Sequence, residues 1–265
     1  MARFAAMTSE ATVRTHIFEH VGWITFDRSP VNAFDWSMVR EVSAAIDAMV
    51  TDPDVRVLVL GSANPKYFSA GADLETFRDI GETGMREWCD LVHGIVHQLR
   101  NSPKPVLAAI AGVAVGGGLE MTLHCDVRFA THTARLGQPE VNINFIPPVG
   151  ATQALARLLG RPAALRFLYD GALINAEQAL AIGLVDELVA DGDLEATVQR
   201  YGESLAAKPP EALAAIRQAV TAGGGMSFDD GLAMEASLAT GLAGTANFAE
   251  GVDSFLSKRS PEWRR

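Results

Sequence analysis

The sequence predicts an α/β fold followed by a helical C-terminal region, and three observations support that prediction. Short apolar runs of strand length alternate with segments of helical periodicity, a pattern typical of repeated strand–strand–helix units. The strand signals fade after about Thr152, where helical spacing takes over. Apolar residues make up 48% of the 265 residues, enough for a substantial core. We therefore expect an α/β core over residues 1–195 and a helical region over residues 196–265.

The first half of the chain is predicted to contain a hairpin, a helix, a strand and a second helix. Two short apolar runs around Glu19 and His20 predict the hairpin. A β-branched run after a turn predicts the strand, and Pro103 and Pro105 end the second helix. In order, these elements cover residues 13–27, 36–49, 55–60 and 87–99.

The second half begins with two more strands and then becomes helical. Residues 106–111 predict a strand, residues 112–118 a glycine loop before a short helix, and residues 127–130 another strand. Apolar positions at helical spacing predict the remaining helices at residues 153–159, 162–169, 176–182, 194–205 and 211–221.

Composition narrows the classes of protein to which the chain can belong. A net charge of −10 disfavours nucleic acid as a partner, because an acidic surface repels phosphodiester backbones. The longest apolar run, residues 106–119, falls short of the roughly 20 residues that a membrane helix needs. Cys89 and Cys125 are unclustered, which favours free thiols in a reducing compartment over a disulfide between them. Residues 1–14 lack the apolar core of a signal peptide, so we expect a cytoplasmic protein.

Two glycine-containing segments can present backbone N–H groups to a ligand. In residues 68–74, Gly71 allows dihedral angles that aim neighbouring N–H groups outward. Residues 109–120 run from a strand through three consecutive glycines into a helix start, where unpaired N–H groups can hold a developing oxyanion. The alternative interpretations are an ordinary surface turn for the first segment and close helix–strand packing for the second.

Glu120 and Glu140 are the candidate acid–base residues. Glu120 ends the second glycine segment. Glu140 lies among apolar and amide residues rather than on a charged stripe. Burial there would raise its pKa and keep it protonated near neutrality, as a general acid requires. The alternative for Glu140 is a loop glutamate that faces solvent.

Other catalytic classes find little support in the sequence. The HExxH, GxSxG, P-loop and GxGxxG patterns are missing. His93 and His97 have the i,i+4 spacing of a helical metal pair, but a helix face without metal is the simpler interpretation. Cys125, next to His124, is expected to be a buried structural residue. Ser69 has no identifiable base that would make it the nucleophile of a hydrolase.

The order of these segments along the chain resembles that of the enoyl-CoA hydratase/isomerase (crotonase) family, from residue 21 to residue 263. The stretches that carry the resemblance are RSPVNA at 28–33, AGAD at 70–73, GVAVGGGLE at 112–120, CD at 125–126, GQPE at 137–140, TQ at 152–153, AEQA at 176–179, GLV at 183–185 and the closing segment 250–259. The resemblance implies a spiral of strand–strand–helix units with a helical C-terminal trimerisation region. It also implies a homotrimer or a dimer of trimers.

The resemblance also implies roles for individual residues. The backbone N–H groups of Ala72 and Gly117 correspond to the oxyanion hole of the family. Hydratases of the family use two glutamates, whereas its isomerases and decarboxylases often keep one or neither. Here Glu120 would be ionised and activate water, and Glu140 would be protonated and deliver a proton to Cα. Coenzyme A would enter as part of the substrate, and neither a metal nor a separate cofactor is implied.

The implied partner is an acyl-CoA thioester. Its coenzyme A portion would contact Ala70, Asp73 and Leu74, and would also meet Phe255 and Lys258 from the C-terminal helix of a neighbouring subunit.

The chain departs from the family pattern at three places. Glu75 stands where lysine is frequent. Pro148 lies in a stretch that is often glycine-rich, and it has no N–H with which to hold the water. Asn142 and Asn144 would then supply polar contacts or indicate a different substrate.

The expected function is that of an enoyl-CoA hydratase, which adds water across the 2,3 double bond to give 3-hydroxyacyl-CoA. The alternatives within the family are an isomerase, a hydrolase and a decarboxylase that use the same enolate. A non-catalytic scaffold or an RNA-binding member of the fold is the alternative from another class. The pair Glu120 and Glu140 and the net charge of −10 favour the hydratase over that last alternative.

Overall fold

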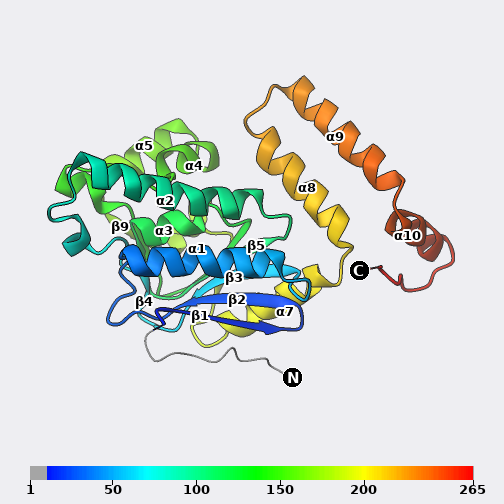
Figure 1. Cartoon of the computed structure of the whole chain (residues 1–265), viewed down its shortest axis with the longest axis horizontal. Coiled ribbons are helices and arrows are strands. Elements are labelled where there is room, and N and C mark those ends of the chain that lie inside the picture. The colour runs from blue at the N-terminus through cyan, green and yellow to red at the C-terminus, as the bar shows by residue number, and fades with distance from the viewer. Residues whose placement is uncertain (1–10, 265) are drawn as a thin grey trace.

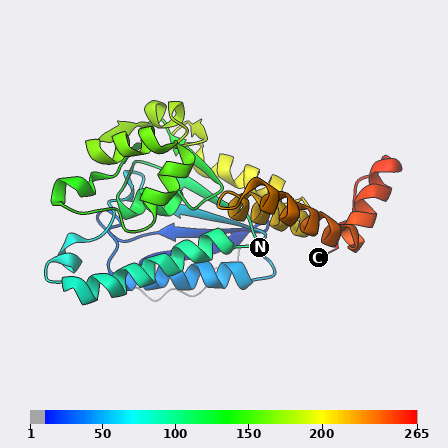
Figure 2. The ribbon, with the colours of Figure 1, turned by 90° about the horizontal axis from the view of Figure 1, so that it is seen from above.

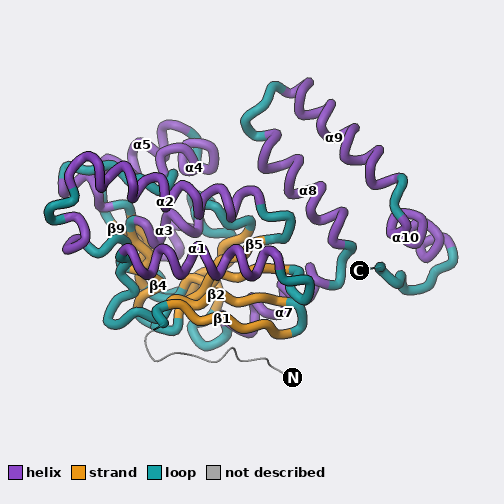
Figure 3. Tube along the Cα trace, in the orientation of Figure 1, coloured by secondary structure: helices purple, strands orange, loops and turns teal. Residues whose placement is uncertain are grey.

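The computed structural model describes residues 11–264 and is built around two β-sheets (Figures 1 and 3). The strands are β1 (Val13–Phe18), β2 (Val21–Phe26), β3 (Val57–Ser62), β4 (Tyr67–Ser69), β5 (Val106–Ile110), β6 (Val113–Val115), β7 (Val127–Thr131), β8 (Arg135–Gly137), β9 (Leu173–Asn175) and β10 (Glu187–Val189). The larger sheet has the order β1-β2-β3-β5-β7-β10 and the smaller one the order β4-β6-β8-β9.

Helices surround both sheets. They are α1 (Trp36–Thr51), α2 (Gly81–Asn101), α3 (Gly117–Thr122), α4 (Ala151–Leu158), α5 (Arg161–Asp170), α6 (Ala176–Ala181), α7 (Leu194–Ala206), α8 (Pro210–Gly223), α9 (Phe228–Ala243) and α10 (Ala246–Leu256), with the short 3-10 helices η1 (Leu74–Phe77) and η2 (Pro139–Ile143).

The large sheet is buried on both faces. From β2 to β10 its strands are parallel, and only β1 pairs antiparallel. Successive side chains of a strand alternate between faces. Leu58 and Leu60 accordingly join the core that includes α1 and α2, whereas Val57 and Val59 join the core that includes α7. Burial on both faces explains why these strands read as continuous apolar runs in the sequence.

The chain passes repeatedly from the large sheet to the small one. β3 is followed by β4, β5 by β6 and β7 by β8, and helix α2 or α3 follows the first two of these pairs. The parallel pairings β3–β5–β7 and β4–β6–β8 stack the successive units side by side. The predicted spiral of strand–strand–helix units is therefore confirmed.

Most predicted elements occur within a few residues of the expected bounds, but α2 begins at Gly81 rather than at residue 87, α9 was not predicted as a separate helix, and several short strands were missed. The predicted glycine loop at 112–118 contains β6 and the first residues of α3. The expectation of helices alone after about Thr152 is wrong, because β9 and β10 lie there. β4 and β8 were not predicted either. Each missed strand has three residues, too few to show a period of two.

The last three helices, α8 to α10, extend away from the sheets (Figures 1 and 2). α7 packs on the large sheet through Leu194, Val198 and Ala206. The predicted boundary at residues 195–196 lies within this helix, and the division into two regions stays a prediction. Residues 1–10, on which the statement about a signal peptide largely depends, lie outside the described residues. Between residues 11 and 264, no helix has the length and apolar character needed to cross a membrane.

Candidate active site

Glu120 is completely buried. It lies on the short helix α3, which begins directly after β6. Its Oε1 atom accepts hydrogen bonds from the backbone N–H groups of Val149 (2.8 Å) and Ala151 (3.0 Å). Its Oε2 atom has no hydrogen-bond partner among residues 11–264. Two backbone donors thus hold one carboxylate oxygen, and the described residues offer the other no donor.

Glu140 approaches the same place from η2. An ideal Cβ atom at Gly116 would lie 2.8 Å from Glu140 Oε1, so a larger residue there would make this carboxyl group shift. Gly116 also has φ +51°, which glycine adopts without strain. The buried amide of Gln138 lies beside the carboxyl group. With its nitrogen toward Glu140, it donates to both carboxylate oxygens at 3.0 and 3.1 Å.

Both glutamates have raised pKa values. Burial raises the pKa of Glu120 to about 8; the hydrogen bond from the Ala151 amide opposes the shift, and the negative charge of Glu140 adds to it. Burial also raises the pKa of Glu140, the direction that its apolar surroundings predicted. Two carboxyl groups that line one cavity resist simultaneous ionisation, so the pair retains a proton near neutral pH.

Two backbone N–H groups lie beside these carboxyl groups. Phe34 pairs with the residues on either side of Ala72: its N–H donates to Gly71 O, and its carbonyl accepts from Asp73 N, each at 2.8 Å. Ala72 therefore directs its own N–H away from Phe34. Gly117 is the first residue of α3, where an N–H has no partner within the helix. An ideal Cβ at Gly117 would lie 3.9 Å from the Ala72 nitrogen, so the two amides are close together.

These groups line one inner cavity of about 230 Å³. Its wall includes both glutamates, Ala72 and Gly117, and most of the remaining wall is apolar. The apolar and aromatic lining residues include Phe34, Val39, Phe77, Trp88, Val92, Met121, Phe145 and Val149. An apolar wall with a few convergent polar groups is the usual character of a small-molecule site.

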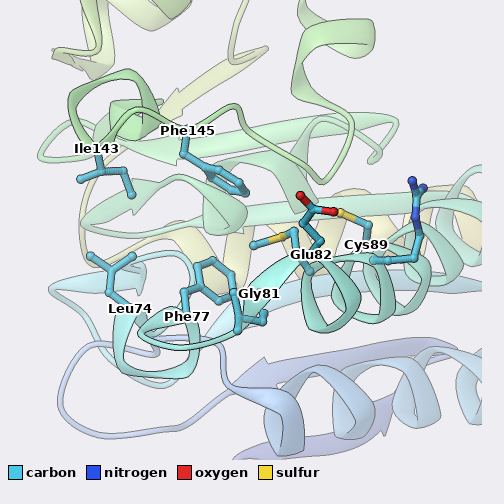
Figure 4. A pocket seen from close by; sticks show the side chains of 10 residues that line it. Leu74, Phe77, Gly81, Glu82, Cys89, Ile143 and Phe145 are labelled. Atoms are coloured by element: carbon cyan, nitrogen blue, oxygen red, sulfur yellow. The ribbon is translucent and has the colours of Figure 1, made fainter.

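A wider outer cavity of about 780 Å³ adjoins the inner one, because Leu74, Phe77, Ile143 and Phe145 line both. Figure 4 shows Phe145 and Phe77 on opposite sides of this outer cavity. Their ring centroids lie 6.2 Å apart. Leu74 and Ile143 are each more than half exposed at its rim. The inner cavity therefore opens to solvent through an apolar mouth.

The residues expected to contact coenzyme A fall into two groups. Ala70 and Leu74 line the inner cavity. Asp73 caps η1 and forms an ion pair with Arg28 at 3.0 Å. In contrast, α10 carries Phe255 near its C-terminal end, and Lys258 lies two residues beyond the last residue of that helix. Figures 1 and 2 show α10 at the opposite end of the molecule from β4, so one chain does not bring these two residues to the cavity.

The departures from the family pattern have structural explanations. Pro148 precedes α4 rather than lying in its first turn, and its carbonyl oxygen is 2.8 Å from the Nε2 atom of His93. The Asn142 amide donates to Gly171 O, and Asn144 ends η2 with φ +57°. Glu75 is exposed and paired with Arg78.

The structure also bears on the predictions made for the cysteines, for Ser69 and for a metal site. Cys89 and Cys125 are free thiols, so the alternative of a disulfide between them is wrong. The Ser69 hydroxyl donates to Asn32 O and accepts from Gly71 N, a structural role in the turn beside Ala72. Residues 11–264 contain no group of three or more His, Cys, Asp or Glu side chains arranged to hold a metal ion.

Sequence reasoning missed the groups that hold the two glutamates in place. The Val149 and Ala151 amides lie 29 and 31 residues beyond Glu120, a separation at which no local pattern reports a contact. His124 was noticed only as a neighbour of Cys125, yet its Nε2 atom is 2.7 Å from Val149 O. His124 lies beyond the end of α3, so no helical spacing in the sequence indicates this contact.

Comparison with known proteins identifies the family. The family model described as enoyl-CoA hydratase/isomerase matches residues 16–265. The chain belongs to this family. As a member of the enoyl-CoA hydratase/isomerase family, it is 31% identical over 243 residues to the short-chain-enoyl-CoA hydratase of Clostridium acetobutylicum, covering 91% of this chain and 93% of that protein. It is 34% identical over 230 residues to the crotonyl-CoA hydratase of Syntrophomonas wolfei, covering 86% and 88%.

The fold agrees with the enoyl-CoA hydratase/isomerase family as well. A solved structure of an enoyl-CoA hydratase from Geobacillus kaustophilus has a TM-score of 0.95 against this chain at 31% identity. The match covers 100% of this chain and 99% of that one, so all of the elements described above, including α8 to α10, belong to the shared fold.

Proposed function

We propose that this family member is an enoyl-CoA hydratase that adds water across the 2,3 double bond of an enoyl-CoA thioester. The observation that carries the proposal is the convergence of two carboxyl groups, Glu120 and Glu140, on one apolar cavity beside the Ala72 and Gly117 amides. Addition of water needs a base for the water, an acid for Cα and a stabiliser for the enolate oxygen, and these four groups match those needs.

The proton shared by the two glutamates decides their roles. In the protein alone, the deeper burial of Glu120 favours its protonated form. A water molecule that donates a hydrogen bond to Glu120 Oε2 stabilises the ionised form and lowers the pKa of this residue. The proton then resides on Glu140, which is partly exposed and already has a raised pKa. Binding of the substrate water therefore leaves Glu120 as the carboxylate base and Glu140 as the carboxylic acid.

The addition follows from this arrangement. The thioester oxygen accepts hydrogen bonds from the Ala72 and Gly117 N–H groups, which stabilise the negative charge that develops on it. Glu120 removes a proton from the water as its oxygen bonds to Cβ. The π electrons of the double bond move toward Cα, which takes the proton of Glu140. The product is the 3-hydroxyacyl thioester, and one proton must return from Glu120 to Glu140 before the next turnover.

The substrate class and assembly are part of the same proposal. Relatives named short-chain-enoyl-CoA hydratase and crotonyl-CoA hydratase support an acyl-CoA thioester as substrate. Ala70, Asp73 and Leu74 would contact its coenzyme A portion, and Phe255 and Lys258 would do so from a neighbouring chain of a homotrimer or dimer of trimers. No separate cofactor is proposed. The free thiols Cys89 and Cys125 support a reducing compartment, the cytoplasm.

The proposal is tested by offering crotonyl-CoA and a 3-enoyl-CoA to the wild type, Glu120→Gln and Glu140→Gln. We expect the wild type to hydrate crotonyl-CoA, with loss of the absorbance of the conjugated thioester. Each variant should be slower by at least about 100-fold, the low end of general acid–base catalysis.

The two substrates separate the alternatives. If the wild type converts the 3-enoyl-CoA into the conjugated isomer but does not hydrate crotonyl-CoA, the protein is an isomerase. If either glutamine variant hydrates crotonyl-CoA at the wild-type rate, the two-glutamate mechanism is wrong. The folded state of each variant is checked by circular dichroism at the same protein concentration.

A further inference from the structure

The peptide units on both sides of Val149 are held by two side chains that lie four residues apart in the sequence. Glu120 Oε1 accepts a hydrogen bond from Val149 N at 2.8 Å. His124 Nε2 lies 2.7 Å from Val149 O. Glu120 is on α3, and His124 follows the end of that helix. Val149 is therefore bonded to Glu120 through its N–H and to His124 through its carbonyl group, and these three residues form one local unit.

The environment of His124 defines its chemical state. The side chain is buried, and burial lowers its pKa to about 4, so the imidazole is neutral near neutral pH. Because a carbonyl oxygen can only accept, Nε2 carries the proton and donates to Val149. Nδ1 has no partner among residues 11–264. The ring also packs on Gly150, where an ideal Cβ would lie 3.0 Å from the imidazole Cε1.

A second histidine holds the neighbouring carbonyl group. His93, on α2, has its Nε2 atom 2.8 Å from Pro148 O. The segment from Pro148 to Ala151 is thus bonded to Glu120 through two N–H groups and to two imidazoles through two carbonyl groups. His97, one turn further along α2, makes no hydrogen bond to this segment within the described residues.

We infer that His124 is a positioning residue, which fixes Val149 so that the Val149 and Ala151 amides hold Glu120 in its reactive orientation. The inference rests on the proposed function, in which Glu120 is the base. Without the imidazole donor, the carbonyl of Val149 is left buried and unpaired, and the segment must move to find another partner. Glu120 Oε1 would then lose well-aligned donors, and its carboxyl group would lose a fixed orientation.

The loss of these donors has a predictable electrostatic sign. N–H groups that donate to a carboxylate stabilise its ionised form, so weakening them raises the pKa of Glu120 above its wild-type value of about 8. The other ionisable groups around this unit stay in place: Glu140 acts on Glu120, Glu120 acts on Cys89, and His93, His97 and Arg100 act on His124. His124 itself titrates far below this range. The alkaline limb of kcat/KM reports loss of the one proton that the glutamate pair retains, and in the protein without substrate this proton resides on Glu120.

The test compares His124→Gln with His124→Asn. The glutamine amide nitrogen can reach the position of Nε2 and donate to Val149, whereas the asparagine amide is one methylene shorter. We expect His124→Asn to lower kcat by about 10-fold or more with KM changed less than about 3-fold, because orientation is lost rather than binding. In that variant the alkaline limb of kcat/KM should move to higher pH. His124→Gln should recover kcat to within about 3-fold of the wild type.

The carboxyl group is also followed without turnover. The infrared band of protonated Glu120, assigned by its loss in Glu120→Gln, is titrated in each protein, and its midpoint should rise in His124→Asn but not in His124→Gln. His97→Asn is the matched control and should leave kcat and the midpoint unchanged. Wild-type kcat and midpoint in His124→Asn would overturn the inference, as would equal losses in both His124 variants with an unmoved midpoint. A wild type that hydrates no enoyl-CoA would instead overturn the proposed function, and the infrared titration would still judge the inference.

Discussion

The sheet-containing part of the molecule and the three C-terminal helices bury their apolar side chains to very different extents. Ile46 and Leu58, in the first part, are fully buried. α9 has no buried residue, and Phe228 and Phe255 are 82% and 83% exposed. Large exposed apolar side chains on neighbouring helices are typical of surfaces that bind a partner, as the proposed trimer requires. The inner cavity is complete within one chain, whereas α8 to α10 present a surface that one chain leaves uncovered.

One buried arginine joins the two parts. Arg217, on α8, donates to Asp126 at 2.8 Å and to the carbonyl oxygens of Leu99, Arg100 and Ser102 at 2.6 to 2.8 Å. These carbonyl groups belong to the C-terminal end of α2, where a helix leaves acceptors unpaired and a cation is favourable. The outward helices are thus fastened to the same helix that lines the cavity with Trp88 and Val92.

If all of the catalytic groups lie in the sheet-containing part, removal of one backbone donor from that part should lower the activity more than any other change considered below. We expect Gly117→Pro to lower kcat for crotonyl-CoA by about 100- to 1000-fold, the usual loss for one oxyanion-hole donor. Proline removes the N–H, and it suits the first position of a helix, so α3 should persist.

Gly117→Ala is the matched control, because it keeps the N–H. Its Cβ would meet Phe34 at 3.5 Å, an ordinary contact distance. Steady-state kinetics of the two variants separates the donor from the added bulk. Equal losses in alanine and proline variants would show that bulk, and not the missing N–H, is responsible.

The sheet-containing part shows how much of the fold and of the candidate site could be predicted from the sequence. The strands β3, β5 and β7 could be predicted because burial on both faces fills them with apolar residues. Glu120, Glu140, Ala72 and Gly117 could be nominated from glycine segments and a family resemblance, and the structure brings all four to one cavity. Their roles stay predictions.

What could not be predicted depends on contacts between distant segments. Gly116 leaves space for the carboxyl group of Glu140, whereas Gly118, two residues further on, packs against Ser69. Close packing is therefore confirmed at Gly118, whereas the oxyanion-binding interpretation of the segment stays a prediction. The four-residue link between Glu120 and His124 through Val149 appears only when the chain has folded.

Loss of the connection between the two parts should have the next largest effect. We expect Arg217→Ala to lower the free energy of unfolding by about 3 kcal/mol, because Asp126 and three carbonyl groups lose a buried partner. Chemical denaturation at fixed protein concentration measures the change.

Arg200→Ala, on α7, is the control, since its exposed side chain donates only to Thr197 in the described contacts. The comparison between the two parts also predicts that Arg217→Ala retains kcat within about 3-fold, as expected for a change outside the cavity. A fall in kcat as large as that of Gly117→Pro would show that the site depends on the position of α8.

The smallest expected effect concerns the end of α10, and it asks whether the outward helices contribute to the site of another chain. Lys258 is exposed and distant from the cavity of its own chain, yet family resemblance assigns it to coenzyme A. If a neighbouring chain brings it to the substrate phosphates, Lys258→Gln should raise KM about 3- to 5-fold at low salt, the size of one exposed ion pair. The difference should shrink at high salt, because ions screen exposed charges.

Lys208→Gln is the control: it removes another exposed lysine just before α8 and should leave KM unchanged. KM equal to that of the wild type in Lys258→Gln at low salt, measured on protein whose mass in solution is that of an oligomer, would show that Lys258 does not contact the substrate phosphates.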